Sequence, residues 1–172
     1  MTDWAGRLAR RRVPLGFATA ILVLLLATPT PATLVAGALV AVAGEALRIW
    51  AAGHLEKSRE VTTSGPYRFT RHPLYVGSGI IAAGAVIASA SIAAAIIALL
   101  YFIGTVTAAV RTEEAFLRAK FGPEYDRYCA GAADTAARRF SWDRVRKNRE
   151  SRALRGLLLA FALLTAKFLW LV

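Results

Sequence analysis

Two long stretches of the chain, residues 13–44 and 73–110, contain no charged side chain. One helix over the second stretch would extend roughly 55 Å at 1.5 Å per residue, whereas the hydrocarbon core of a bilayer is about 30 Å thick. The second stretch is therefore expected to fold back on itself, with a turn at residues 89–91. In the first stretch, the prolines of TPTP at residues 28–31 break helices and predict another hairpin.

These two hairpins and a last apolar segment predict an all-α membrane bundle of about five transmembrane helices. The expected spans are residues 14–27, residues 32–52, the two halves of 73–110, and residues 156–172. We treat residues 1–172 as one membrane domain with three parts. Residues 1–60 form the N-terminal hairpin, residues 61–130 the core that carries the polar motifs, and residues 131–172 a basic linker with an additional C-terminal span. The arginine-rich start imitates a cleaved leader, but a second apolar run follows at once, which favours a retained span.

The charged residues indicate how such a bundle is oriented. Lys and Arg number 22 against 11 Asp and Glu, and they are gathered in residues 7–12, 54–71 and 111–155. In a five-span arrangement all three blocks lie on one side, and Lys and Arg accumulate on the cytoplasmic side of membranes. We therefore expect a bacterial inner-membrane protein whose N-terminus and helical segment 111–155 are cytoplasmic and whose C-terminus is outside. Membrane lipids explain the basic loops, so no nucleic-acid partner is expected.

The segment SGPYRFTRHPLY, residues 64–75, concentrates polar groups at the start of the third expected span. Pro73 suits the first position of a helix and keeps His72 out of the helical region. The positive end of the helix dipole, the exposed amides, Arg71 and His72 together suit a carboxylate or phosphate. Tyr75, about one turn later, can stack on a flat ring or donate a hydrogen bond. The alternative is that Arg71 and His72 only anchor the helix end at the headgroups, with Tyr75 in the interfacial aromatic belt.

Two adjacent carboxylates, Glu113 and Glu114, follow the fourth expected span. The hairpin returns them to the membrane surface at which His72 lies. There they are placed to bind ribose hydroxyls or a cation. The alternative for Glu114 is an ion pair with Arg111 or Arg118 at helical spacing.

The remaining ionisable residues in apolar surroundings have simpler interpretations. Glu45 and Arg48 lie three residues apart in the second span, where ions are costly unless paired, so a mutual ion pair is expected, although either can also reach an acceptor. Lys167 is expected to extend to the outer headgroups. No metal site is expected, because His54 has no further histidine or cysteine at ligand spacing, and Cys129 is a lone thiol.

The ordered set TTSGPYRFTRHPLYVGS, an apolar hairpin and RTEEAFLRAKFGPEYDRYC resembles the isoprenylcysteine carboxyl methyltransferase and phospholipid N-methyltransferase group of integral membrane enzymes. The resemblance covers residues 61–129. It implies S-adenosyl-L-methionine as cofactor, in a pocket closed off from bulk water, and a hydrophobic or lipidated methyl acceptor that enters from the bilayer. The expected cofactor-binding residues are Tyr67, His72, Pro73, Tyr75 and Glu114, and the expected catalytic residues are Arg71, Glu113 and Glu45.

The expected reaction is direct displacement, because a sulfonium methyl group is already activated. A carboxylate acceptor needs no base, whereas an ammonium acceptor first loses a proton, for which Glu45 and Glu113 are the candidates. Two other classes of protein fit parts of the pattern. One is an NADPH-dependent membrane sterol-type reductase, which shares a similar C-terminal motif. The other is a non-enzymatic lipid-binding helix bundle.

Overall fold

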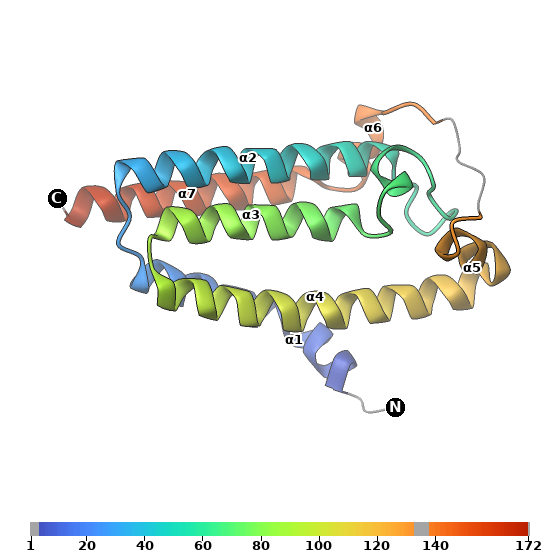
Figure 1. The fold of residues 1–172 in the computed structure, drawn as a ribbon, viewed down its shortest axis with the longest axis horizontal. Helices are drawn as coiled ribbons and strands as arrows, with labels where there is room; N and C mark the ends of the chain where they lie inside the picture. The colour runs from blue at the N-terminus through green and yellow to red at the C-terminus, as the bar shows by residue number, and fades with distance from the viewer. Residues whose placement is uncertain (1–3, 133–137, 172) are drawn as a thin grey trace.

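A computed structural model describes residues 4–132 and 138–171 of the chain (Figure 1). Residues 133–137, part of the expected basic linker, lie outside the described residues. The described helices are α1 Trp4–Leu26, α2 Pro31–His54, the 3-10 helix η1 Gly65–Arg68, α3 Pro73–Ser89, α4 Ile92–Phe121, α5 Pro123–Cys129, α6 Trp142–Lys147 and α7 Ser151–Leu171.

Five of these helices are apolar over most of their length. The helices α2, α4 and α7 are long and apolar enough to cross a membrane, and Val13–Leu26 and α3 are shorter apolar helices. Large apolar side chains are exposed along them, among them Ile92 at 83 % and Leu100 at 69 %. Such a surface on a helical bundle suits contact with lipid rather than water. The expected all-helical membrane bundle is confirmed.

The bounds of two helices differ from the sequence-based expectation. Helix α1 begins at Trp4 and contains Pro14, instead of beginning near residue 14. Helix α4 continues past residue 110 to Phe121 as one helix of 30 residues. The charged part continues the fourth span because its Ala, Leu, Glu, Lys and Arg residues favour helix. Gly122, with φ +50°, ends it, and Pro123 begins α5.

Helices α2 and α3 pack through facing glycines. A Cβ atom added at Gly84 would lie 2.5 Å from the carbonyl oxygen of Gly37, and one added at Gly44 would lie 2.8 Å from that of Gly77. Small residues allow membrane helices to approach until their backbones touch. The positions of these four glycines therefore fix how α2 and α3 align.

The two ends of the bundle differ in character (Figure 1). One end carries the C-terminus and the two interhelical turns, which are joined by a hydrogen bond of 2.8 Å from the Thr28 amide to the Ser89 carbonyl. Lys167, expected at the outer headgroups, lies at this end and donates to the carbonyls of Leu24 and Leu25 at 2.6 and 2.7 Å. It thus caps the C-terminal end of α1. The opposite end carries the loop between α2 and α3, together with α5 and α6.

Candidate active site

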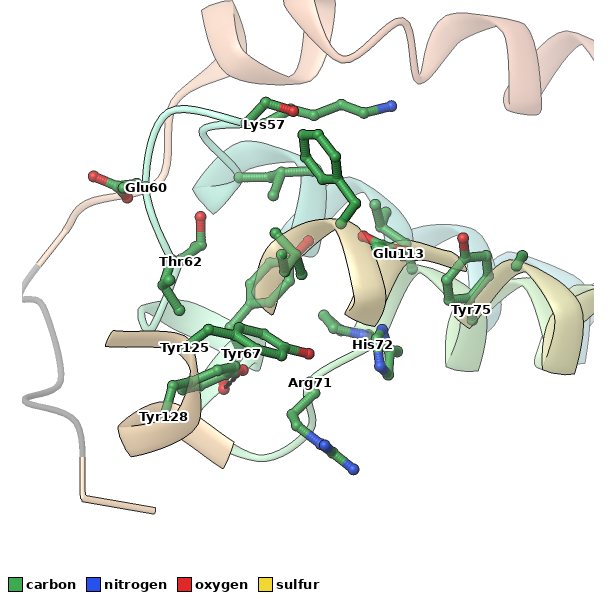
Figure 2. A pocket seen from close by; sticks show the side chains of 18 of the residues that line it. Lys57, Glu60, Thr62, Tyr67, Arg71, His72, Tyr75, Glu113, Tyr125 and Tyr128 are labelled. Carbon is green, nitrogen blue, oxygen red and sulfur yellow. Dashed lines mark hydrogen bonds between the residues drawn. The ribbon is translucent and has the colours of Figure 1, made fainter. Parts of the chain in front are cut away.

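A pocket of about 660 Å³ lies where the end of α2, the first turn of α3, the charged half of α4 and α5 meet. Figure 2 shows Tyr67, Tyr125 and Tyr128 grouped together, with His72, Tyr75 and Glu113 farther along α3 and α4. The volume is within the range of about 300 to 1,000 Å³ that is common for small-molecule sites. The pocket is at the end of the bundle that holds the charged segments.

Most of the residues singled out in the sequence meet at this pocket. Its lining includes Tyr67, Arg71, His72, Pro73, Tyr75 and Glu113. Glu114 and Glu45 are not among the lining residues. The hairpin of α3 and α4 therefore brings the start of α3 close to the carboxylates of α4. Of these two carboxylates, Glu113 lines the pocket and Glu114 does not.

The first turn of α3 has the geometry that its sequence predicts. His72 is the N-cap residue, with a non-helical backbone of φ −131° and ψ 54°, and Pro73 is the first helical residue. The His72 carbonyl accepts the Tyr75 amide at 3.0 Å and the Val76 amide at 3.1 Å. The rings of His72 and Tyr75 are tilted, with centroids 5.9 Å apart. The positive end of the α3 dipole thus faces the pocket beside Arg71 and His72.

Glu114 holds two of the pocket residues by their side chains. Its Oε1 lies 3.0 Å from a terminal nitrogen of Arg71 and 3.1 Å from Nε2 of His72. Its Oε2 lies 3.4 Å from Arg118, one helical turn later. The helical ion pair weighed as an alternative is therefore present together with the contacts to Arg71 and His72. Glu114 acts on the pocket through those two side chains.

Glu113 has a different environment from its neighbour. Its side chain is exposed and lines the pocket. Within the described part of the chain it makes no hydrogen bond or ion pair. Its carboxylate is therefore available to a ligand.

A tyrosine cluster forms another part of the pocket. The Tyr128 hydroxyl donates to the Tyr67 carbonyl at 2.7 Å, and the rings of Tyr125 and Tyr128 have centroids 6.1 Å apart. Burial raises the pKa of Tyr128 to about 12 and raises the pKa of Tyr67 as well. Both hydroxyls stay protonated at neutral pH, so they can donate hydrogen bonds but do not act as bases. Sequence reasoning did not assign Tyr125 and Tyr128 to the site, although the motif GPEYDRY contains both.

The loop between α2 and η1 borders the pocket and is held from two sides. Glu60 forms an ion pair with Arg138, and Glu56 lies 3.4 Å from Lys147. From α4, Lys120 donates to the Ser58 carbonyl at 2.7 Å. These contacts fix a loop that carries no regular structure of its own.

Arg48 is a lining residue that the sequence placed in an ion pair with Glu45. That pair exists at 3.8 Å, but Arg48 Nε donates at 2.6 Å to Glu150, just before α7. Sequence reasoning missed Glu150, which lies 102 positions from Arg48. Among residues 4–132 and 138–171, no group of three or more His, Cys, Asp or Glu side chains is arranged to hold a metal ion.

Comparison with known proteins identifies the family. Residues 32–124, more than half of the chain, match the family model of phospholipid methyltransferases. The nickel-cobalt-cadmium resistance protein NccN of Alcaligenes xylosoxydans xylosoxydans is 39 % identical over 85 residues, and the cobalt-zinc-cadmium resistance protein CzcN of Cupriavidus metallidurans is 38 % identical over 85 residues. Each match covers 47 % of this chain and 38 % of the relative, so the chain matches well under half of these relatives' length. No solved structure matches the chain significantly. The family match includes the first turn of α3 and both carboxylates of α4, and the chain therefore belongs to the phospholipid methyltransferase family of membrane methyltransferases.

Proposed function

We propose that the protein transfers a methyl group from S-adenosyl-L-methionine to a hydrophobic or lipidated acceptor by direct displacement. The observation that carries this proposal is the pocket itself. It joins Arg71 and His72 at the N-terminus of α3 to the unpaired Glu113 of α4, at the charged end of an apolar bundle. A water-soluble cofactor and a lipid-embedded acceptor can meet at such a position.

The donor set of the pocket fits this cofactor. Arg71, His72 and the free amides of α3 suit its carboxylate. Glu113 suits the ribose hydroxyls or the ammonium group, and the tyrosine rings suit a flat purine. When bound, S-adenosyl-L-methionine supplies a methyl group activated by a positively charged sulfur.

The side chains of this protein then have to bind the cofactor and the acceptor, orient them toward each other, and exclude water. Orientation is the main contribution, because an activated methyl group needs no covalent enzyme intermediate. The loop at residues 55–62 and the helix α5 border the pocket and limit the access of water. A carboxylate acceptor needs no base. For an ammonium acceptor, Glu113 is the proton acceptor, because it lines the pocket without a partner, whereas Glu45 does not line it.

Membranes that contain the protein, incubated with methyl-labelled S-adenosylmethionine, are expected to yield a labelled hydrophobic product by mass spectrometry. Membranes with the His72→Ala variant should yield much less. Turnover that is nearly flat from about pH 6 to about pH 8 indicates a carboxylate acceptor, whereas a steep rise indicates an ammonium acceptor that has to lose its proton, and Glu113→Gln should then lower turnover across the whole range.

Calorimetry on the purified protein separates the other classes of function. S-adenosylhomocysteine is expected to bind. Binding of NADPH instead would support a reductase, and binding of neither would support a non-enzymatic lipid-binding bundle. Either of these results contradicts the proposal.

We also propose that the end of the bundle with α5 and α6 faces the cytoplasm and that the C-terminus lies outside. The support is the gathering of basic residues in the loop after α2, in the second half of α4, in α5 and in α6, and the absence of charge in the turns at residues 28–31 and 89–91. In a Cys129→Ser background, cysteines at Thr30 and Ser91 should react with an impermeant maleimide added from outside. A cysteine at the exposed Glu124 should react only after the membrane is opened. The reverse labelling pattern would overturn this orientation.

A further inference from the structure

The side chain of Arg48 connects three segments of the chain at the wall of the pocket. From α2, its Nε donates to Glu150 at 2.6 Å, and a second guanidinium nitrogen lies 2.5 Å from the same oxygen. The third nitrogen donates to the Leu74 carbonyl at 3.3 Å and to the Ser78 hydroxyl. Leu74 lies in the first turn of α3, between Pro73 and Tyr75. Arg48 therefore anchors the turn that carries the proposed cofactor-binding residues.

Two carboxylates lie near Arg48, those of Glu45 and Glu150. Arg48 mainly binds Glu150, which is the more distant of the two in sequence. Glu45, one turn earlier on α2, is only 4 % exposed, and its nearer oxygen lies 3.8 Å from Arg48 Nε. Both carboxylate oxygens of Glu45 lack a hydrogen bond with any described residue. Residues at i and i+3 are neighbours on a helix, and an ion pair between them contributes only about 0.2–0.5 kcal/mol. The direction of the guanidinium is therefore set by Glu150 and not by its neighbour on the helix.

Glu150 is held in place by the segment before α7. Arg144 donates to the Gly53 carbonyl at 2.7 Å, and Asn148 donates to the carbonyls of Ala52 and Leu55 at 2.9 and 3.0 Å. These are C-terminal carbonyls of α2, which have no partner within the helix. Glu150 is only 5 % exposed. The segment is thus fixed on α2 and brings a buried carboxylate to Arg48.

The path of the Arg48 side chain is equally constrained. A Cβ atom added at Gly77 would lie 2.6 Å from Arg48 Cγ, so the stem of the arginine passes directly over this glycine. The Ser78 hydroxyl, which accepts from Arg48, itself donates to the Leu74 carbonyl at 2.8 Å. The close contact between α2 and α3 at Gly77 thus leaves space for the Arg48 guanidinium beside Leu74 and Ser78.

We propose that Glu150, which lies beyond the residues matched by the family model, is a positioning residue for the methyl-transfer site. It holds Arg48 against Leu74 and Ser78, with only a longer contact to Glu45, and so fixes the first turn of α3. This inference rests on the proposed function. Without the charge of Glu150, Arg48 turns toward Glu45 and releases the turn of α3. A small displacement of binding groups is enough to weaken a site of this kind.

The test measures S-adenosylhomocysteine binding by calorimetry on the full-length protein in detergent. Glu150→Gln should bind at least about tenfold more weakly than the wild type. Glu45→Gln, the matched control, should stay within about threefold of it. The double variant Glu45→Gln/Glu150→Gln should recover most of the lost affinity, because the competing carboxylate is gone. A merely structural role predicts no recovery, since the double variant leaves Arg48 with no carboxylate at all.

Three results would overturn the inference: a folded Glu150→Gln that binds like the wild type, a Glu45→Gln that loses as much affinity as Glu150→Gln, or a double variant weaker than Glu150→Gln. If Glu150→Gln does not fold, Ser78→Ala removes one anchor without changing charge and should weaken binding about three- to tenfold. Unchanged binding in Ser78→Ala then contradicts the proposal. A wild type that fails to bind S-adenosylhomocysteine contradicts the proposed function instead. In that case the positioning role of Glu150 is tested without a ligand, by amide hydrogen exchange at residues 73–78. Exchange is expected to be faster in Glu150→Gln than in Glu45→Gln.

Discussion

Replacement of Glu114 by glutamine is expected to weaken S-adenosylhomocysteine binding by about 1 to 3 kcal/mol, although this side chain does not line the pocket. The carboxylate holds Arg71 and His72 at 3.0 and 3.1 Å. Glutamine keeps the shape but removes the charge, so Arg71 and His72 keep at most a neutral acceptor in place of a carboxylate. Calorimetry on the detergent-solubilised protein measures the change, and His72→Ala should show a loss of similar size.

The matched control for this prediction is Glu124→Gln. Glu124 is an exposed carboxylate on α5 and does not line the pocket. Its replacement should change the affinity by no more than about twofold, which is the usual scale for surface substitutions. Equal affinities for Glu114→Gln and Glu124→Gln would show that Glu114 has no part in the site.

Replacement of Gly84 by valine is expected to destabilise the fold more than any change in the pocket. Even the first added carbon would lie 2.5 Å from the Gly37 carbonyl oxygen and 2.7 Å from the Ala41 amide nitrogen. These are backbone atoms, which cannot turn aside as a side chain can. The helices α2 and α3 must separate, at a cost of about 1 to 3 kcal/mol or more. Thermal unfolding in detergent measures the loss.

Ala83→Val is the control for helix packing. Ala83 is the preceding residue of α3, and its side chain is exposed. Valine lowers the helix propensity at Ala83 and slightly raises it at Gly84, so a larger loss in Gly84→Val can come only from the contact with the neighbouring backbone, which Ala83 does not face. A Gly84→Val protein that unfolds at the same temperature as Ala83→Val would refute the close packing of α2 against α3.

Most of the fold could be predicted from the positions of the uncharged stretches in the sequence. Uncharged runs of more than one membrane thickness have to fold back, and the turns at residues 28–31 and 89–91 carry the residues that permit it. The continuation of α4 to Phe121 was not predictable from polarity, because a helix can leave the membrane without ending. Helix α4 ends at Gly122, whose backbone adopts a positive φ that a right-handed helix does not allow.

Only those parts of the site could be predicted whose geometry depends on residues adjacent in sequence. His72 and Pro73 define the start of α3 by their own backbone preferences, and the structure agrees. The separate directions of Glu113 and Glu114 depend on the rotation of α4 about its axis, which the sequence does not specify. The choice of Glu150 over Glu45 by Arg48 depends on a contact between residues 102 positions apart. No spacing rule within one helix can predict it.

The cap that Lys167 places on α1 has a consequence for how the protein is made. Helix α1 is synthesised before α7, so the carbonyls of Leu24 and Leu25 have no lysine partner until α7 has been translated. A polypeptide whose synthesis stops before α7 still has the methyltransferase motifs, but its first helix has lost its bond to the last. The ammonium group that forms this bond has to cross the bilayer with α7 in the proposed orientation, at a cost of about 2.5 to 3.5 kcal/mol at the membrane centre. The two carbonyl hydrogen bonds form once the ammonium group has crossed, and they stabilise the inserted α7 against α1.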